Sequence, residues 1–340
     1  MSNKKLIKQM RKVVEKRGKK AYETAKEAIL KERFEYEAIR EALLYFMGVW
    51  PNFHHPALLS LACESVGGNP ETTASIGASI VLLTGAADIH DDIIDQSATK
   101  NSKATVLGKF GRDIALLVGD ALLLEGCTFL GETCEKLPKK QRKTVVDLVK
   151  KAFSEMSGAE AEEASLKGNW NVKPETYLNV MRRKAAIADM AFRVGAILGG
   201  ASPEEIETLG NYGRILGILA NIRDEFVDVF ESKELENRAE NECLPLPILY
   251  AFRDKAVKEK IIPILRKKDL KDKDAFDIAD IVMTAEGVLE LKKEMDYMRE
   301  RGIKCLGNIK ATKINKILSI LLEATVEGLW NLSTSRKRRT

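Results

Sequence analysis

The chain has 340 residues, of which 45% are hydrophobic and 31% charged, and its 55 basic and 50 acidic side chains leave a formal net charge of +5. So small a surplus of basic residues gives no reason to expect nucleic-acid binding. An aromatic content of 6% and modest numbers of Gly and Pro argue against a β-sandwich. Five scattered cysteines without a C-x-x-C pair indicate buried thiols in a reducing cytoplasm rather than a disulfide or zinc framework.

Apolar residues spaced three and four apart, the pattern of helices, recur along the whole chain. In the N-terminal half they predict helices within residues 1–48, 58–66, 70–89, 114–130 and 145–164. The polar residues 96–105 are expected to form a loop. The stretch 114–130 is nearly all apolar but too short to span a bilayer with its flanks, so it predicts a central buried helix. No run of 18 or more consecutive apolar residues occurs, and we expect no transmembrane segment.

In the C-terminal half the same spacing predicts helices within residues 177–198, 213–230, 246–252, 261–265, 278–298 and 314–332. Ser202 followed by Pro203 and two acids has the pattern of a capped helix start. Residues 231–243 are expected to form a charged loop, and residues 333–340 a basic tail. We therefore predict an all-α protein with a single domain over residues 1–340, although this length would also allow two small domains.

Two short acidic runs of the same form lie within apolar helical sequence. The first spans residues 91–95 (DDIID) and the second spans residues 224–228 (DEFVD). On a helix, the first and last carboxylates of each run share a face, where they are costly unless a cation compensates them. Mg²⁺ binds such oxygen ligands together with substrate phosphates. The runs predict more than one Mg²⁺ ion around a diphosphate, held by Asp91, Asp95, Asp224 and Asp228. The alternative is two solvated helix faces.

The two runs and their surroundings resemble the aspartate-rich motifs of the trans-isoprenyl diphosphate synthase (polyprenyl synthetase) family. Further stretches match in the family's order: 103–106 (KATV), 118–123 (VGDALL), 184–186 (KAA) and 246–251 (LPILYA). The resemblance covers about residues 50–255. It implies a bundle of antiparallel helices around a deep central cavity. The family's reaction is Mg²⁺-dependent transfer of a prenyl chain from an allylic diphosphate to isopentenyl diphosphate.

The resemblance also implies residue roles in the half of the site that binds the allylic diphosphate. The catalytic residues would be Asp91, Asp92, Asp95, Asp224, Asp228 and Lys184. The diphosphate would be bound by Lys100, Lys184, Arg223 and Lys233. Lys100 stands where the family has Arg, and Lys233 would substitute for a family Lys whose position is taken here by Cys243. Three acids fall where the family lines its cavity, with a solvated face as the alternative: Glu160, Glu162 and Glu163.

The other half of the site, which binds isopentenyl diphosphate in the family, is eroded in this sequence. Its positions fall in register on Asn52, His55, Thr84 and Asn101. His55 is mostly neutral at pH 7, and charge-assisted bonds supply much of the affinity for phosphate. Transfer to isopentenyl diphosphate or to another acceptor therefore stays open. So do cyclisation, as in a class I terpene cyclase, and a non-catalytic, regulatory role in a heteromeric prenyl synthase. An unrelated helical protein is the remaining alternative.

Product length depends on the residues one helical turn before the first acidic run, where a bulky side chain would form the floor of the cavity. Here these residues are Ala86 and Ala87, and Leu83 is the next large side chain before them. The small residues predict an open tunnel and a prenyl chain of C20 or more. Close packing of helices is the alternative explanation for them.

The family also implies partners and a location. The substrate would be an allylic prenyl diphosphate, and the assembly a homodimer or a heteromer with a related synthase. We expect a cytoplasmic protein without a nucleic-acid partner, with peripheral membrane contact for release of a long product. The basic tail 333–340 is interpreted as a solubilising end, and a clamp for a diphosphate or an anionic membrane surface is the alternative.

Overall fold

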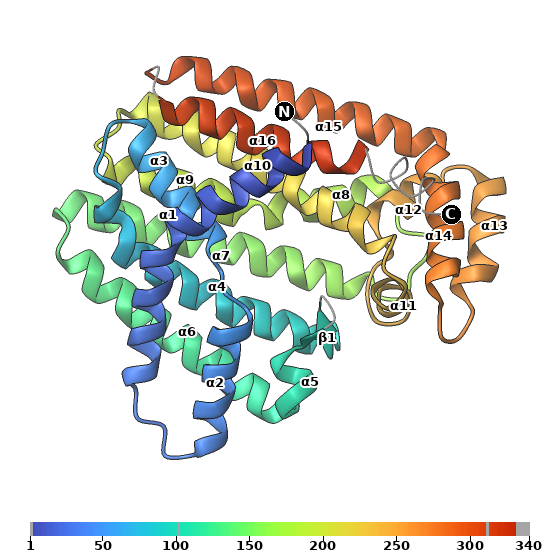
Figure 1. Cartoon of the computed structure of the whole chain (residues 1–340), viewed down its shortest axis with the longest axis horizontal. Helices are drawn as coiled ribbons and strands as arrows, with labels where there is room; N and C mark the ends of the chain where they lie inside the picture. The colour runs from blue at the N-terminus through green and yellow to red at the C-terminus, as the bar shows by residue number, and fades with distance from the viewer. Residues whose placement is uncertain (1–2, 101–102, 311–312, 331–340) are drawn as a thin grey trace.

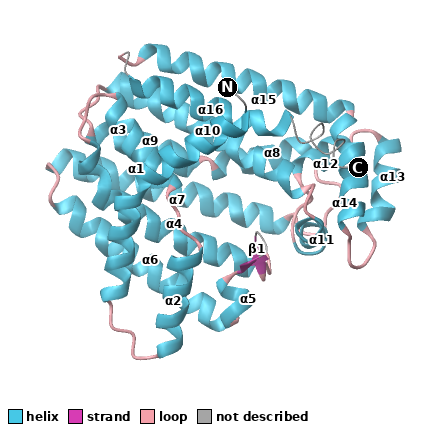
Figure 2. Cartoon of the chain, in the orientation of Figure 1, coloured by secondary structure: helices cyan, strands magenta, loops and turns pink. Residues whose placement is uncertain are grey.

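The computed structural model describes residues 3–100, 103–310 and 313–330, which form a bundle of helices (Figure 1; Figure 2). The all-α prediction is confirmed. The strands within these residues are two short segments, β1 (Thr99–Lys100) and β2 (Lys103–Ala104), which pair antiparallel where a loop was expected. Asn101 and the basic tail 333–340 lie outside the described residues.

Both acidic runs lie at helix ends, the first at the end of α4 and the second at the end of α10. The first half of the chain contains α1 (Asn3–Lys31), α2 (Glu37–Val49), α3 (His54–Ser65), the 3₁₀ turn η1 (Pro70–Thr73), α4 (Ala74–Ile94), α5 (Val106–Phe110), α6 (Arg112–Glu135) and α7 (Lys139–Ser165). The second half contains α8 (Pro174–Lys184), α9 (Ala186–Leu198), α10 (Pro203–Asp228), α11 (Ser232–Asn241), α12 (Leu246–Ala251), α13 (Lys255–Leu265), α14 (Asp272–Thr284), α15 (Glu286–Cys305), the 3₁₀ turn η2 (Leu306–Asn308) and α16 (Lys313–Trp330).

The start of α10 is the one that the sequence predicts. Ser202 Oγ accepts the N–H of Glu205 (3.2 Å), and Glu205 Oε2 accepts the N–H of Ser202 (2.8 Å), with Pro203 in the first turn. This reciprocal capping satisfies two N–H groups that a helix start leaves open, and a Ser cap contributes about 1 kcal/mol. The cap fixes one end of the helix whose other end carries the second acidic run.

Two local predictions near the site were wrong. Residues 231–243 contain the helix α11, because Leu235, Arg238 and Ala239 together form a buried face. Charged residues are normally exposed, so the run of charged residues at 231–243 was predicted to be a loop. The predicted helix 177–198 is interrupted at Ala185, where α8 ends and α9 begins.

Helix α4 takes part in both hydrophobic clusters of the interior. One cluster joins it to α1, α2 and α6 through Val81, Leu82, Ala86 and Ile89. The larger cluster joins it to α3, α9 and α10 through Ile76, Ile80 and Leu83. Because α4 packs along α1 and α6 as well as α3, the first acidic run sits at the end of a helix that is held on several sides.

Small residues let α4 approach its neighbours closely. A Cβ on Gly85 would lie 2.9 Å from Cε1 of Phe46 on α2. A Cβ on Gly126 of α6 would lie 2.9 Å from the side chain of Leu83. Close helix packing, the alternative explanation for the small residues before the first acidic run, is therefore seen at Gly85, which directly precedes Ala86 and Ala87.

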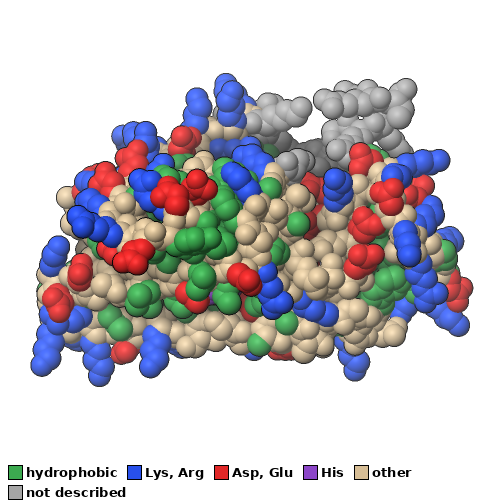
Figure 3. Space-filling model, turned by 90° about the horizontal axis from the view of Figure 1, so that it is seen from below, with side chains coloured by type: hydrophobic (Ala, Val, Ile, Leu, Met, Phe, Trp, Pro, Cys, Tyr) green, Lys and Arg blue, Asp and Glu red, His purple; other side chains and the backbone are tan. Residues whose placement is uncertain are grey.

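Helix α6 differs from the central buried helix that its apolar sequence predicts. Four of its leucines are at least 42% exposed: Leu116, Leu117, Leu123 and Leu124. Two described stretches, Pro70–Ile94 and Arg112–Glu135, have the length and hydropathy of a membrane span. The first is 72% buried, as expected for a core helix, whereas the second is only 33% buried. The lower face of the molecule also shows hydrophobic side chains gathered between charged ones (Figure 3).

Candidate active site

The first acidic run lies opposite Lys100 of β1. The distance from Lys100 Nζ is 2.6 Å to Asp92 Oδ1 and 3.7 Å to Asp91 Oδ2. Asp92 is buried, whereas 31% of the Asp91 side chain and 18% of the Asp95 side chain are exposed. Lys100 therefore neutralises the buried member of the run, and Asp91 and Asp95 keep oxygen atoms that a ligand could reach.

The second acidic run ends α10 beside Arg238 of α11. Arg238 donates to both oxygens of Glu225 (2.9 Å each), and its other terminal nitrogen is 3.9 Å from Asp228 Oδ2. Asp224, in contrast, is 63% exposed and pairs with its neighbour Arg223. Glu225 is thus a buried structural acid, Asp228 lies close to Arg238, and Asp224 lies at the rim.

Helices α7 and α8 contribute a connected set of polar groups. Lys184 Nζ is 2.9 Å from Glu160 Oε2 and also pairs with Glu163. The hydroxyl of Tyr177 donates to Glu163 (2.6 Å) and accepts from Arg238 (2.6 Å). A buried chain of contacts therefore links Lys184 on α8 to Arg238 on α11.

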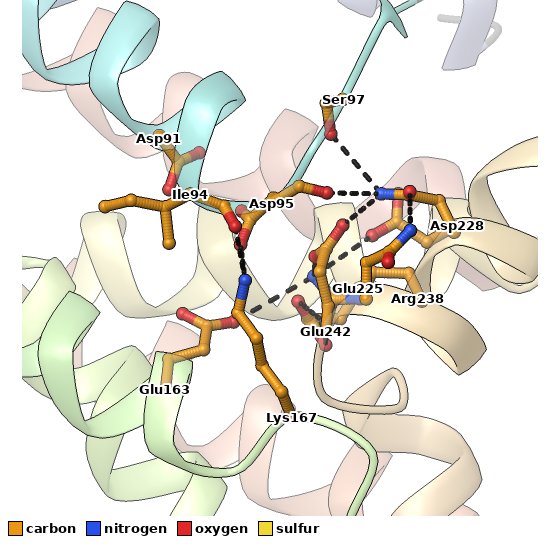
Figure 4. Close-up of polar contacts among 12 residues, drawn as sticks. Asp91, Ile94, Asp95, Ser97, Glu163, Lys167, Glu225, Asp228, Arg238 and Glu242 are labelled. Carbon is orange, nitrogen blue, oxygen red and sulfur yellow. Dashed lines mark hydrogen bonds and ion pairs between the residues drawn. The ribbon is translucent and has the colours of Figure 1, made fainter.

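Two donors bind the carbonyl groups at the end of α4. Lys167, just after α7, contacts the carbonyl oxygen of Ile94, and its Nζ is 3.5 Å from Asp95 Oδ1 (Figure 4). Asn237 of α11 donates to the carbonyl oxygen of Asp95 (3.2 Å) and to Glu242 Oε1 (2.6 Å). The end of the first run is thereby attached to the segments that follow α7 and precede α12.

Carboxylates outnumber cations in what we call the carboxylate cluster. Its acids are Asp91, Asp92, Asp95, Glu160, Glu163, Glu225, Asp228 and Glu242, and its cations are Lys100, Lys167, Lys184 and Arg238. Eight formal negative charges against four positive ones leave a surplus of four among these side chains. A further cationic ligand would find a favourable potential here.

The pKa values reflect this crowding. Burial, and then repulsion from Asp91, Glu242 and Glu163, raises the pKa of Asp95 to about 7. Burial likewise raises the pKa of Glu160 to about 7 although Lys184 opposes it. Several of these carboxyl groups thus bind protons more tightly than they would in water.

The donor set of this cluster fits Mg²⁺. The nearby side chains offer carboxylate oxygen, the ligand that this ion prefers. Within the described residues, no three acidic, His or Cys side chains already form a metal cage. Mg²⁺ is usually held by only one or two carboxylates together with waters and substrate phosphates, so an incomplete cage suits it. Asp91 and Asp95 on α4, with Asp228 and Asp224 on α10, would hold the ions.

Asp88, one turn before Asp91, and His54 on α3 are both exposed side chains. A pocket of about 840 Å³ opens beside the carboxylate cluster, where Asn237 binds the carbonyl of Asp95 and the side chain of Glu242. It is lined by Ser97, Asn237 and the predicted diphosphate ligand Lys233 among others.

Three positions of the eroded half-site come together. Asn52 Nδ2 is 3.1 Å from Thr84 Oγ1 and 3.3 Å from His55 Nδ1, and Asn52 Oδ1 accepts the N–H of His54 (3.1 Å). Burial, and then His54, lowers the pKa of His55 to about 3, so this imidazole is neutral at pH 7. These side chains therefore form a neutral network in which the Asn52 amide already has partners.

The three positions assigned to chain length have different surroundings. Ala87 is half-buried and lies one turn before Asp91 on the same face of α4. Ala86 and Leu83 are buried in the two hydrophobic clusters. Ala87 is thus the one of these three positions whose side chain is not fully buried.

Sequence reasoning missed two cations of the cluster. Arg238 occurs in a run of charged residues that was interpreted as a loop, and only the apolar Leu235 and Ala239 beside it indicated a buried helix face. Lys167 carries no local signal at all, since its contact with Ile94 joins residues 73 positions apart. Of the three acids of α7 that the resemblance placed at the cavity, Glu160 and Glu163 belong to the carboxylate cluster. The third, Glu162, pairs with Arg183 outside the cluster.

The amino-acid sequence matches a known protein family and several of its characterised members. The family model described as Polyprenyl synthetase matches residues 38–282. A short chain isoprenyl diphosphate synthase of Methanothermobacter thermautotrophicus is 32% identical over 183 residues, which are 53% of this chain and 54% of that protein. Geranylgeranyl pyrophosphate synthase 11 of Arabidopsis thaliana is 30% identical over 225 residues, 62% of each chain. The matched region therefore spans little more than half the length of these relatives.

Solved structures share the fold at low sequence identity. Geranylgeranyl pyrophosphate synthetase from Pyrococcus horikoshii superimposes with a TM-score of 0.79 at 23% identity, covering 95% of this chain and 98% of that one. A decaprenyl diphosphate synthase from Rhodobacter capsulatus also gives 0.79, at 19% identity, covering 95% and 99%. The helical bundle is therefore that of these proteins from end to end.

The crowded carboxylates predict a pH-dependent stability. The pKa values of Glu160 and Glu242 are about 7 in the folded protein, above the 4.5 that is usual for the group. Between these values the folded state holds more protons than the unfolded chain, so the free energy of unfolding falls as the pH rises. We expect the melting temperature in a chelator to fall by a few degrees from about pH 5 to pH 8. Glu160→Gln and Glu242→Gln should each reduce this slope, and Glu240→Gln, on an exposed site, should not. A slope that all three variants leave unchanged would contradict the prediction.

Proposed function

Because the chain belongs to the polyprenyl synthetase family, we propose that it is a Mg²⁺-dependent prenyltransferase. It cleaves an allylic prenyl diphosphate and transfers a long chain, C20 or more, to isopentenyl diphosphate or another acceptor. The observation that carries this proposal is the carboxylate cluster, in which two acidic runs from separate helices share one site with Lys100, Lys184 and Arg238. Such a site suits a substrate that is itself an anion and arrives with cations.

The residues of the chain supply binding and orientation. Lys100 and Lys184 offer positive charge to the leaving diphosphate, whose C1–O bond breaks with the electron pair going to oxygen. Divalent ions, when bound, neutralise the diphosphate and make it a better leaving group. Asp91 and Asp95 on one helix and Asp228 on another would hold them. Ala87, on the same face as Asp91, leaves room for the prenyl chain.

The acceptor half of the site supports a second candidate. The network of Asn52, His55 and Thr84 carries no formal charge at pH 7, because burial lowers the pKa of His55 to about 3. A diphosphate acceptor gains little from such groups. This observation favours an uncharged acceptor, or the alkene of the bound chain itself as in a class I terpene cyclase. A non-catalytic subunit of a heteromeric synthase is the third candidate.

We further propose a homodimer in a cytoplasmic setting. The row of exposed leucines on α6 supports an interface between subunits, since contiguous exposed apolar surface is typical of contact sites. A heteromer with a related synthase would use the same surface. The five free cysteines suit a reducing compartment, and a long prenyl product would require peripheral contact with a membrane for its release.

A product assay by mass spectrometry tests the function. Purified protein with Mg²⁺ receives C15 and C20 allylic diphosphates, each with and without isopentenyl diphosphate. We expect diphosphate release, reduced on the order of a hundredfold in Asp91→Asn, because a carboxylate that would hold a divalent ion at the leaving diphosphate is lost. Asp147→Asn, exposed on α7, is the matched control and should stay active.

The products distinguish the candidates. Extension that requires isopentenyl diphosphate would identify an ordinary synthase and remove the case for an uncharged acceptor. An alcohol or hydrocarbon formed without it would favour that acceptor or a cyclase. Absence of turnover in both the wild type and Asp91→Asn would contradict an active enzyme and support the non-catalytic subunit.

Chain length can be tested at Ala87. We expect Ala87→Phe to shorten the longest product by at least one five-carbon unit, because the new ring would block the face that carries Asp91. Ala86→Phe should instead lower the melting temperature, because Ala86 is 1% exposed in a packed cluster and overpacking costs about 1–3 kcal/mol. Products of unchanged length in Ala87→Phe would show that the floor lies elsewhere.

The homodimer can be tested by light scattering after size exclusion. The double variant Leu117→Glu and Leu124→Glu places two charges on the exposed face of α6, where the leucines are 53% and 71% exposed, and should give a monomer. Leu289→Glu on α15, at a site that is 45% exposed, should remain a dimer. A wild-type protein that is monomeric at micromolar concentration, or a double variant that stays dimeric, would exclude this interface.

A further inference from the structure

Lys167 belongs to the carboxylate cluster, but binding and cleavage of the diphosphate as proposed above give it no role. Its backbone is held against the end of α11. The neighbouring Gly168 adopts a positive φ of 67° and donates its N–H to the carbonyl of Glu242 (3.1 Å). Trp170 Nε1 donates to the carbonyl of Ala239 (3.3 Å). The position of Lys167 is thus fixed by the fold.

The side chain of Lys167 crosses to the end of α4. Its ammonium group contacts the carbonyl oxygen of Ile94 and lies 3.5 Å from Asp95 Oδ1, with 28% of the side chain exposed (Figure 4). Carbonyl groups at a helix C-terminus carry partial negative charge and favour a cation. Asn237, a neutral donor, binds the next carbonyl, that of Asp95. A neutral donor is thus accepted at the neighbouring carbonyl, and the position of the Lys167 charge beside a carboxylate calls for a second explanation.

That explanation lies in the surroundings of Asp95. Its carboxylate is close enough to Asp91, Glu163 and Glu242 to be repelled by all three, and Lys167 is the cation that offsets them. Asp95 is also one of the two carboxylates on α4 that are placed to hold a divalent ion. An ammonium group and a metal ion would compete for the same oxygen atoms.

We propose that Lys167 is a tethered competitor for the divalent ion at Asp95. In the free protein its ammonium group partly neutralises Asp95, and it must move away from that carboxylate when a metal ion binds there. A diphosphate offers the displaced ammonium group a new anionic partner. Metal and diphosphate then bind more tightly together than either does alone, and this coupling is reciprocal. The inference rests on the proposed function, which assigns a metal ion to Asp91 and Asp95.

Calorimetric titration of the full chain with Mn²⁺, with and without inorganic pyrophosphate, tests this role. Lys167→Gln keeps a donor for the carbonyl of Ile94 but removes the charge. We expect it to bind Mn²⁺ about tenfold more tightly than the wild type, since a neighbouring charge shifts such equilibria by about one to three powers of ten. Pyrophosphate should strengthen Mn²⁺ binding more in the wild type than in this variant.

Two further variants separate charge from structure. Lys167→Arg keeps the charge and should bind Mn²⁺ as the wild type does. Lys150→Gln removes a charge from an exposed site on α7 and should also match the wild type. A capping role alone predicts that Lys167→Gln changes neither Mn²⁺ affinity nor the effect of pyrophosphate, and that result would overturn the inference.

The result also distinguishes this inference from the function on which it rests. If the wild type binds Mn²⁺ and Asp95→Asn does not, the metal site stands, and equal affinities of the wild type and Lys167→Gln refute the competitor role alone. If none of these proteins binds Mn²⁺ with or without pyrophosphate, the metal-dependent function and the inference both fail. Should Lys167→Gln unfold, Lys167→Met at a temperature below its melting transition provides the same comparison.

Discussion

Arg238 carries a buried guanidinium group whose two terminal nitrogens bind groups from several helices, whereas its Nε has no hydrogen-bond partner within the described residues. Its side chain is 8% exposed and binds Glu225 of α10, Glu242 after α11 and the hydroxyl of Tyr177 on α8. Removing one partner of a buried ion pair costs about 3–5 kcal/mol, because the other charge is left uncompensated. The ends of α8, α10 and α11 are therefore held together by one side chain. Two acids of the second run therefore differ in their contacts. Glu225 is bound by Arg238, whereas Asp228 Oδ2 lies 3.9 Å from the nearest nitrogen of Arg238.

The same constraint leaves the site short of positive charge. Lys100, Lys184 and Arg238 are each shared between carboxylates, Lys167 is shared between Asp95 and the carbonyl of Ile94, and each cation belongs to a different segment of the fold. Asp95 illustrates the result, because Lys167 alone offsets the repulsion by three neighbouring acids, and the pKa of Asp95 is still raised to about 7. A protein that only needed stability would gain by replacing such buried charges with apolar groups. Their retention is understandable if a cationic ligand completes the balance, and divalent ions bound with a diphosphate have that property.

The extent to which the sequence predicted this structure depended on the range of each interaction. The acidic runs, the cap at Ser202 and the helical periodicity are local patterns, and the structure contains all of them. Arg238 escaped notice because its burial depends on partners from three other segments. Lys167 escaped because its contact with α4 forms only when the end of α7 folds against α11. The exposure of α6 could not be predicted either. An apolar sequence indicates that a helix face will be buried, but it does not indicate whether the same chain or another one buries it.

Helix α4 connects the two halves of the site, and its packing decides how they face each other. Thr84, Asp88, Asp91 and Asp95 follow one another at spacings of three and four, so they form a single stripe along the helix. The stripe begins in the neutral network of Asn52 and ends among the carboxylates. About a quarter-turn around the helix from this stripe, the close approach of Gly85 to Phe46 of α2 fixes the rotation of the helix about its axis. A bulkier residue there would turn the stripe and would move both of its ends together, although it belongs to neither. Under the proposed function, the choice of acceptor is therefore coupled through one rigid helix to the cleavage of the diphosphate.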